Sequence, residues 1–187
     1  MSQINEQPDP VKLVVNLFYG EELWRERALS EMSVLWGAID LRMEPVPFGH
    51  TTYYSHEMGG GLQKMMVGFE PLVEREALVR LKHEATAIEL ALAKGRGADG
   101  RRPVNIDPGI MLPEKFVLST GKNFPQRIYL GRGVYADLTL IWRQGRFEAL
   151  PWTYADYLEG RVLRFLEEAR LKLLAQLAER RAEEAAP

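Results

Sequence analysis

The pattern of hydrophobic and polar residues divides the first part of the chain into strands and helices. A nearly continuous apolar run over residues 11–18, broken mainly by Lys12 and Asn16, predicts a strand that is buried on both faces. Apolar residues at helical spacing predict two amphipathic helices, and strict alternation over 39–44 predicts a half-buried strand. The predicted order is a strand (11–18), a helix (21–36), a strand (39–44), a strand (63–69), a helix (74–93) and a strand (103–106).

This βαββαβ order is that of a split βαβ, or ferredoxin-like, sheet with its helices on one face. Further strands near 114–119, 126–130, 134–143 and 146–149 are expected to form an antiparallel meander. A long helix is expected from 155 to 181, with an apolar stripe of Val162, Phe165, Leu166, Ala169, Leu173 and Leu177. We therefore expect an α+β fold: a ferredoxin-like βαββαβ core, extended by an antiparallel β-meander, with a long C-terminal helix.

One hairpin register follows from the glycines at positions 131 and 133. If residues 131–133 form a three-residue loop, the facing pairs are Leu130–Val134, Tyr129–Tyr135, Ile128–Ala136 and Arg127–Asp137. One face is then apolar and contains Ile128, Leu130, Val134, Ala136, Leu138, Leu140 and Trp142. The other face presents Arg127, Tyr129, Tyr135, Asp137 and Thr139, so this register gathers polar groups on one side of the hairpin.

The whole chain, residues 1–187, is expected to form a single α+β domain. Residues 1–10 are expected to be a flexible lead-in, 11–154 the core, and 155–187 the C-terminal helix with a frayed tail. Residues 48–61 show no clean period and predict a long irregular loop, a kind of segment that is disproportionately functional. The Gly/Arg-rich residues 95–102 predict a mobile linker.

Composition excludes several classes of protein. A net charge of -2 gives no electrostatic reason to bind nucleic acid or anionic lipid. The absence of cysteine excludes disulfides, thiol nucleophiles and zinc–thiolate sites, and fits a reducing compartment. No run approaches the roughly 18 apolar residues of a membrane span, and the first ten residues do not form a signal peptide. We therefore expect a cytoplasmic protein that binds neither nucleic acid nor membranes.

Polar and aromatic residues are unusually dense between Pro103 and Tyr157, within one small predicted sheet. Strands normally carry polar residues only where water or a ligand meets the sheet, so this segment is the predicted site. The candidate catalytic residues are Asp107 and Asp137. The candidate ligand-binding residues are Lys115, Thr120, Lys122, Arg127, Tyr129, Tyr135 and Tyr154.

Each of these residues also has a purely structural interpretation. Arg127 opposite Asp137 is suited to a phosphate or carboxylate, but it is equally suited to a cross-strand ion pair worth about 0.2–1 kcal/mol. Residues 119–123 offer donors for an anion, although they lack the spacing of a P-loop and make an ordinary turn. Asp107 before Pro-Gly is either a functional strand-end carboxylate or a turn opener. The aromatic residues of 151–157 either stack on a ligand or pin the last helix to the sheet.

Histidine chemistry and metal binding receive little support. His50-Thr51-Thr52 resembles half of a two-histidine phosphoesterase, but the second half is missing because His83 has the wrong spacing and lies within a helix. His56-Glu57 begins like a zinc-protease helix, yet Gly60 stands where the second histidine is needed. Magnesium could use Asp107 and Asp137, but no spacing requires it. We therefore predict no metal site.

Several motifs together resemble a known bacterial family. They are PVKL at 10–13, the residues Tyr53, Tyr54, Glu57, Met58 and Gly59, NIDPG at 105–109, KFVLST at 115–120, RIYLGRGVYADLTL at 127–140 and PWTYADY at 151–157. On these residues the chain resembles domain of unknown function 4416, and the likeness spans Val11 to Tyr157. The resemblance implies a single-domain cytoplasmic protein of bacterial type and supplies no mechanism.

Three functional hypotheses remain. The first is a binding domain for a small anionic ligand, such as a nucleotide or phosphorylated metabolite, held by Lys115, Lys122 and Arg127 and by tyrosines at the site. The second is a hydrolase or transferase acting on a phosphate-containing substrate, with Asp107 or Asp137 as general base or magnesium ligand. The third is a protein-interaction module, or a homo-oligomer, that uses the C-terminal helix. The sequence identifies neither the ligand nor a cofactor.

Overall fold

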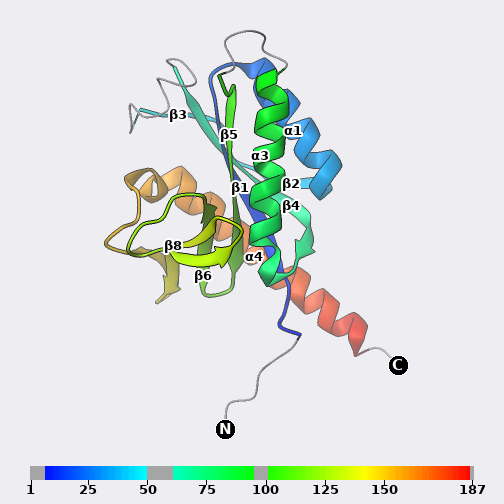
Figure 1. The fold of residues 1–187 in the computed structure, drawn as a ribbon. Helices are drawn as coiled ribbons and strands as arrows, with labels where there is room; N and C mark the ends of the chain where they lie inside the picture. The colour runs from blue at the N-terminus through cyan, green and yellow to red at the C-terminus, as the bar shows by residue number, and fades with distance from the viewer. Residues whose placement is uncertain (1–6, 50–60, 95–100, 186–187) are drawn as a thin grey trace.

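A computed structural model describes residues 7–49, 61–94 and 101–185. Within these residues nine strands form one sheet in an α+β fold, and every strand pairing given for the sheet is antiparallel (Figure 1). Most of the predicted irregular loop at 48–61, with His50 and His56, lies outside the described residues. The same holds for most of the predicted linker at 95–102.

The chain forms nine strands, three α-helices and two short 3-10 helices within the described residues. They are β1 (Val11–Tyr19), α1 (Glu22–Trp36), β2 (Ile39–Arg42), β3 (Val46–Pro47), β4 (Gln63–Val73), η1 (Arg75–Ala77), α3 (Leu78–Lys94), β5 (Val104–Leu112), β6 (Lys115–Thr120), β7 (Ile128–Gly131), β8 (Val134–Arg143), β9 (Arg146–Ala149), η2 (Ala155–Leu158) and α4 (Gly160–Glu184). In the sheet the order is β2–β4–β1–β5–β6–β8–β7, with β3 paired to β4 and β9 to β8.

Helices cover both faces of the sheet. In Figure 1, α1 and α3 lie in front of β1, β4 and β5, and α4 lies behind them. Every residue of β1 is buried, which confirms the prediction of a strand covered on both sides. Alternate residues of β1 therefore enter two different cores, because neighbouring side chains on a strand point to opposite faces.

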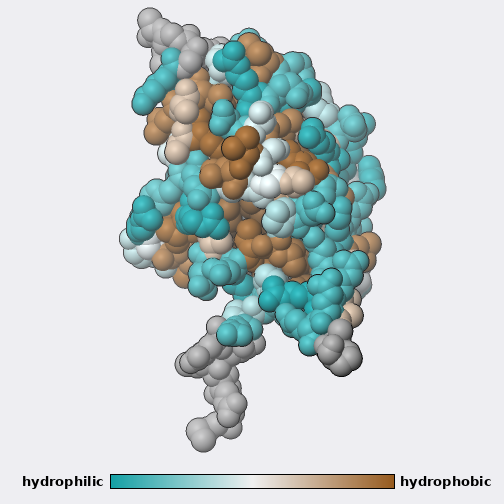
Figure 2. Space-filling model, turned by 90° about the vertical axis from the view of Figure 1, so that its right-hand side faces the viewer, coloured by the Kyte–Doolittle hydropathy of each residue, from teal (hydrophilic) through white to brown (hydrophobic). Residues whose placement is uncertain are grey.

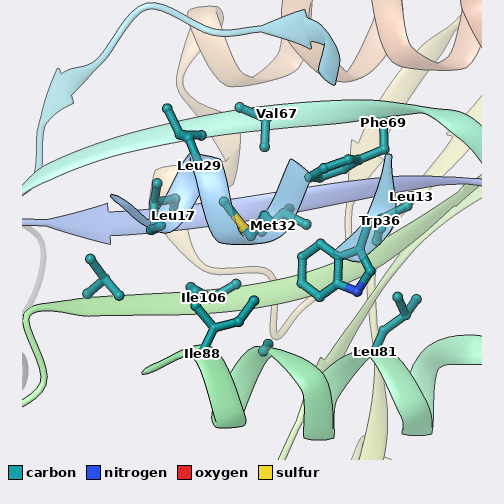
Figure 3. Close-up of a cluster of buried hydrophobic side chains, with 14 of the residues drawn as sticks. Leu13, Leu17, Leu29, Met32, Trp36, Val67, Phe69, Leu81, Ile88 and Ile106 are labelled. Atoms are coloured by element: carbon teal, nitrogen blue, oxygen red, sulfur yellow. The ribbon is translucent and has the colours of Figure 1, made fainter. Parts of the chain in front are cut away.

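The first core lies between the sheet and the helices α1 and α3. Leu13 and Leu17 of β1 meet Met32 and Trp36 of α1, and α3 contributes Leu81, as Figure 3 shows. Burying a large apolar side chain of this kind stabilises a fold by about 1.5–3 kcal/mol. Leu81, Ala85, Ile88 and Leu92 of α3 face this core, which confirms the predicted helical spacing. Leu78, at the start of α3, is buried in a separate cluster.

The second core lies under α4. The stripe predicted for the C-terminal helix is buried in full: Val162, Phe165, Leu166, Ala169, Leu173 and Leu177 pack on Val14, Met66 and Met111 of the sheet. The helix begins at Gly160 rather than at 155, because residues 155–158 form the short 3-10 helix η2. It continues to Glu184, so the tail is helical where fraying was expected. Arg181 binds Asp9 at 2.6 Å and links the two ends of the described chain.

A buried polar cluster ties α4 to the sheet. The Lys12 ammonium donates to Asp40 Oδ2 and to the Phe69 carbonyl, both at 2.8 Å, and to Gln176 of α4 at 3.2 Å. Lys172, also on α4, lies 3.0 Å from the same Asp40 oxygen. The ion pair with Asp40 explains how a charged lysine can be buried within an otherwise apolar strand.

The Pro-Gly turn predicted after Asp107 is wrong. Residues 108 and 109 lie inside β5, where Pro108 faces Val15 and Gly109 faces Val14 across the β1–β5 ladder. Gly109 is needed there for a close approach: a Cβ at this position would lie 2.8 Å from the ring of Phe116. The turn chemistry of Asp-Pro-Gly is overridden by these contacts within the sheet.

The predicted meander is also corrected. β8 is its central strand and pairs with β6, β7 and β9, whereas β6 does not pair with β7. In the β7–β8 hairpin the pairs Tyr129–Tyr135 and Ile128–Ala136 are confirmed, but Gly131 rather than Leu130 faces Val134, because an irregularity interrupts the register. Ile128 and Leu130 are exposed, and β7 is an edge strand of the sheet.

The outer surface of α1 is only partly polar. Figure 2 views the molecule from the side on which α1 lies in Figure 1, and hydrophobic atoms gather there among hydrophilic ones. Leu23, Val34 and Leu35 of α1 are exposed, while Trp24, Ala28, Leu29, Met32 and Trp36 are buried. Throughout the described part of the chain, no helix is both long enough and apolar enough to cross a membrane.

Candidate functional site

The sheet opens between β5 and β6, and the opening creates the site. The β5–β6 ladder ends at Gly109 and Leu118, whereas the β1–β5 ladder continues to Val104 and the β6–β8 ladder continues to Thr120. Pro108 has no N–H to extend the β5–β6 ladder. Its carbonyl instead accepts a hydrogen bond from Ser119 Oγ at 2.6 Å. Beyond this point the two strands enclose a cavity of about 550 Å³.

Side chains from several separate segments line this cavity. β1 contributes Asn16 and Phe18, and α3 contributes Lys82, Thr86 and Glu89. From β5 and the residues before it come Arg102, Asn105 and Asp107; from β6 and the turn after it come residues 118–122; from β8 comes Asp137. The connections between elements add Phe48 and Arg127, and the segment before α4 adds Tyr154, Asp156 and Tyr157. The volume lies within the range of about 300–1,000 Å³ that is usual for small-molecule sites. The site therefore depends on the tertiary fold rather than on one contiguous motif.

Two side chains of α3 replace the missing partner strand along the open edge of β5. Glu89 accepts a hydrogen bond from the Ile106 N–H at 2.6 Å, and the Lys82 ammonium donates to the Ile106 carbonyl at 3.1 Å. Lys82 also donates to Asp107 Oδ1 at 2.8 Å, and Arg102 donates to Glu89 at 2.9 Å. Backbone groups that lost their ladder partners are thus satisfied by charged side chains, as buried polar groups require.

These contacts shift the pKa values of both α3 residues. Burial alone would lower the pKa of Lys82, but the negative charges of Asp107 and Glu89 outweigh burial and raise it, so Lys82 stays an ammonium. Burial raises the pKa of Glu89 above its ordinary value, although Lys82, the Ile106 N–H and Arg102 oppose this. Shifted carboxyl groups in a cleft are typical of functional sites.

Replacing Glu89 with Gln is expected to remove a pH dependence of stability. Because the pKa of Glu89 in the folded protein exceeds its ordinary value of 4.5, the folded state holds this proton more tightly than the unfolded chain. Its stabilising contribution is therefore complete below pH 4.5 and is lost as pH rises through the raised pKa. Urea unfolding between about pH 4 and pH 7 should show the free energy of unfolding, wild type minus variant, falling with pH. A difference that stays constant would contradict this assignment.

Arg127 is held in one orientation on the opposite wall. Its Nε donates to Asp137 Oδ2 at 2.7 Å, one terminal nitrogen donates to the Lys122 carbonyl at 3.0 Å, and the other donates to the Tyr154 hydroxyl at 3.3 Å. The guanidinium also stacks on the Phe124 ring, 4.6 Å from its centroid. The side chain is only 4% exposed, so the guanidinium is fixed before any ligand arrives.

The floor of the cavity is a polar part of the central strands. Asn16 of β1 faces Asp107 of β5, and Phe18, two residues along, faces Asn105. The Asn16 amide donates through Nδ2 to the Tyr157 hydroxyl at 3.1 Å, whereas its Oδ1 is buried and finds no hydrogen-bond partner within residues 7–49, 61–94 and 101–185. An unpaired buried acceptor costs about 1–3 kcal/mol unless something in the cavity donates to it.

A buried ion pair lies beside this floor. Lys64 of β4 faces Phe18 and donates to Asp156 Oδ2 at 2.6 Å, and its ammonium lies 4.2 Å from the centroid of the Tyr157 ring. Burial lowers the pKa of Lys64, which the negative charge of Asp156 only partly offsets. Asp156 lies in η2, just before α4, so this pair links β4 to the start of the C-terminal helix.

The structure brings six of the nine predicted site residues together at the cavity: Asp107, Thr120, Lys122, Arg127, Asp137 and Tyr154. Lys115 lies at the other end of β6, 3.3 Å from Glu114. Tyr129 and Tyr135 pack against each other on the hairpin, with ring centroids 5.2 Å apart, and do not line the cavity. His83 contacts the Arg132 carbonyl at 3.1 Å and does not line it either.

Sequence reasoning missed the part of the site that comes from β1 and α3. Asn16 carried a usable signal, because it is a polar residue within a strand that is otherwise apolar and buried. Lys82, Thr86 and Glu89 lie on one side of α3 at spacings of four and three, but polar residues at such spacings usually face solvent. No group of three or more His, Cys, Asp or Glu residues able to hold a metal ion occurs in the part of the chain that the structure describes.

A family model described as "Domain of unknown function (DUF4416)" matches residues 9–172, which include every element that lines the cavity. No curated protein matches the chain.

Proposed function

The chain belongs to the family described as Domain of unknown function (DUF4416), and we propose that its cavity binds a small anionic ligand, such as a nucleotide or another phosphorylated metabolite. The observation that carries this proposal is the fixed guanidinium of Arg127 in the wall of a cavity of about 550 Å³. Arginine is well suited to phosphate and carboxylate because its planar fork donates two parallel hydrogen bonds.

Three side chains of the cavity keep N–H or O–H groups that the hydrogen bonds described above do not use, and these groups could donate to an anion. A guanidinium carries five N–H donors, and the hydrogen bonds of Arg127 use one on each of its three nitrogens. The Lys82 ammonium has three donors, of which Ile106 and Asp107 take two. The Thr120 hydroxyl accepts from the Lys122 N–H and keeps its own hydrogen to donate.

The carboxylates of the cavity hold these cations in place. Asp137 pairs with Arg127 at 2.7 Å, and Asp107 pairs with Lys82 at 2.8 Å. Each pair lowers the net charge that a ligand meets, but it also removes the entropy cost of ordering a long side chain on binding. We therefore expect selectivity for a ligand whose anionic group fits this geometry, rather than general attraction of anions.

We also propose a ferredoxin-like core and a cytoplasmic location. The order β2–β4–β1–β5, with α1 and α3 on one face, supports a ferredoxin-like interpretation of residues 11–112. A chain without cysteine supports a location in the reducing cytoplasm.

A second candidate function is hydrolysis or transfer of a phosphate-containing group. Asp107 and Asp137 both line the cavity that holds Arg127 and Lys82. A bound phosphate ester would therefore meet carboxylates able to accept a proton as well as cations able to stabilise developing charge. Release of inorganic phosphate from the ligand that binds would favour this function over binding alone.

The third hypothesis, interaction through the C-terminal helix, needs an exposed apolar stripe. Leu166, Leu173 and Leu177 are instead buried against the sheet of their own chain. Partner binding and oligomer formation through α4 remain predictions that this packing does not favour.

A thermal-shift screen tests the proposed function. The purified chain is heated with nucleotides, sugar phosphates, other phosphorylated metabolites and inorganic phosphate, each with and without magnesium. A ligand present at 100 times its dissociation constant should add about 2.7 kcal/mol to the free energy of unfolding, which raises Tm by several degrees. A folded protein that responds to none of these compounds would contradict the proposal.

A further inference from the structure

The cavity has an aromatic end as well as a charged end. Phe18 and Phe48 pack together with ring centroids 4.5 Å apart, and the Lys64 ammonium lies 6.0 Å from the centroid of the Phe18 ring and 4.2 Å from that of Tyr157. Asn16 joins this group through its hydrogen bond to the Tyr157 hydroxyl. Phe18, Phe48, Tyr157 and Asn16 all line the cavity, and we refer to these four residues as the aromatic end.

The aromatic end contains a polar atom that the protein itself leaves unsatisfied. Asn16 is 1% exposed, and its Oδ1 has no hydrogen-bond partner among the residues that the structure describes, although the amide is fixed by Tyr157. Buried amides usually satisfy both of their polar atoms. A side chain held this firmly, with a bare acceptor in the lining of a cavity, is suited to receive an N–H or O–H group from a ligand.

Both ends line the same cavity of about 550 Å³, so one molecule can contact both. Asn16 and Asp107 are direct partners in the β1–β5 ladder, and Asp107 is the carboxylate that binds Lys82. Directly facing residues of an antiparallel pair have Cα atoms about 4.5–5.5 Å apart. The Asp107 carboxylate already accepts from Lys82 and Asn105, and its four lone-pair sites leave room for a further donor, such as a sugar hydroxyl.

We propose that the ligand is a nucleoside phosphate: a planar heterocycle lies at the aromatic end and donates an N–H hydrogen bond to Asn16 Oδ1, while the phosphate lies at the Arg127 end. This inference rests on the proposed function, since it assumes that the cavity binds a phosphorylated compound, and it selects one class among such compounds. Flat rings stack favourably on aromatic side chains whatever their identity. An amide acceptor then distinguishes a ring with a donor edge from a simple sugar phosphate, which has no ring to place there.

Calorimetric titration compares ligands that differ only in the heterocycle or only in the phosphate. The probes are the four ribonucleoside 5′-monophosphates, ribose 5-phosphate, the unphosphorylated nucleosides and inorganic phosphate. The proteins are the wild type, Asn16→Leu, Tyr157→Phe, and Met66→Leu as a control. Asn16→Leu removes both hydrogen-bonding atoms at similar size, and Tyr157→Phe removes the hydroxyl that holds the amide. Met66 is the neighbour of Asn16 on β4, so its replacement disturbs the same row of the sheet and leaves the amide intact.

In the wild type, at least one nucleoside monophosphate should bind about tenfold or more tighter than ribose 5-phosphate. Asn16→Leu should reduce that ratio severalfold and leave the affinity for ribose 5-phosphate unchanged, Tyr157→Phe should reduce the ratio in the same direction, and Met66→Leu should retain it. If Asn16→Leu does not fold, as judged by circular dichroism, Tyr157→Phe alone decides the role of the amide.

The outcomes separate this inference from the proposed function. Equal affinity for ribose 5-phosphate and for every nucleoside monophosphate would overturn the inference and leave an anion-binding cavity. A nucleotide preference that survives in both Asn16→Leu and Tyr157→Phe would also overturn it, because the heterocycle would then bind elsewhere. Failure of every phosphorylated probe to bind the folded wild type would overturn the proposed function as well.

Discussion

Replacing Arg127 with Ala is expected to weaken binding of the anionic ligand by about 100-fold or more, because a charge-assisted hydrogen bond contributes about 1.5–3 kcal/mol and the guanidinium can donate two to one anion. Lys82 is not expected to take over this role, because its ammonium is paired with Asp107 on the other wall of the cavity. Arg127→Lys should recover only part of the loss, because an ammonium lacks the planar fork. The dissociation constants of the three proteins for the best ligand of the thermal-shift screen measure the effect.

The control for this experiment is Arg143→Ala. Arg143 lies on β8, the strand that carries Asp137, but it is exposed and does not line the cavity. The Arg143→Ala protein should therefore bind the ligand with the same dissociation constant as the wild type. Because Arg127→Ala also leaves the buried Asp137 unpaired, its folding is checked separately, and Arg127→Ala/Asp137→Asn removes that charge. Wild-type affinity in a folded Arg127→Ala variant would show that the ligand does not use this residue.

Replacing Lys64 with Met is expected to lower the free energy of unfolding by about 3–5 kcal/mol, because a buried carboxylate is left without its partner. The Lys64 side chain is 1% exposed and that of Asp156 is 9% exposed, with 2.6 Å between their charged atoms. For a chain of this size the loss corresponds to a fall in Tm of roughly 10 °C. Urea unfolding and thermal unfolding monitored by circular dichroism measure both quantities.

The double variant Lys64→Met/Asp156→Leu should be much more stable than Lys64→Met alone, because no uncompensated charge remains. Arg80→Ala serves as the comparison for an exposed pair: Arg80 binds Glu84 at 3.0 Å on the surface of α3, and such a pair contributes roughly 0.3–0.5 kcal/mol. If Lys64→Met costs no more than Arg80→Ala, the buried pair does not hold the segment before α4 against the sheet.

Most of the elements could be predicted from sequence because their patterns are strong and local. The both-face burial of β1, the apolar face of α3 and the stripe of α4 each follow from the spacing of apolar residues, and each is confirmed. The wrong predictions arise where contacts between distant parts of the chain override the local pattern. Asp-Pro-Gly at 107–109 favours a turn locally, but pairing with β1 and the close contact of Gly109 with Phe116 keep it in a strand.

The site was only half predictable for a related reason. Arg127 and Asp137 could be paired from a hairpin register, and their ion pair is present. Lys82 and Glu89 could not be assigned to the same place, because they reach it only through the opening between β5 and β6. The opening forms because the β5–β6 ladder ends at Gly109 and Leu118, and no local sequence pattern predicts where a ladder ends. Asn16 is the exception, since a polar residue within a buried strand indicates either a structural partner or a ligand.

Titration of ¹⁵N-labelled protein with a nucleoside monophosphate, followed by NMR, tests the central claim most directly. If the cavity between β5 and β6 binds this class of ligand, the amide signals that shift should gather at residues 104–107, 109, 118–122 and 136–138, and along α3 near Lys82 and Glu89. The side-chain amide signals of Asn16 should shift with them. Shifts that gather instead on the exposed side of α1 or along α4, or no shifts with any phosphorylated compound, would contradict the claim.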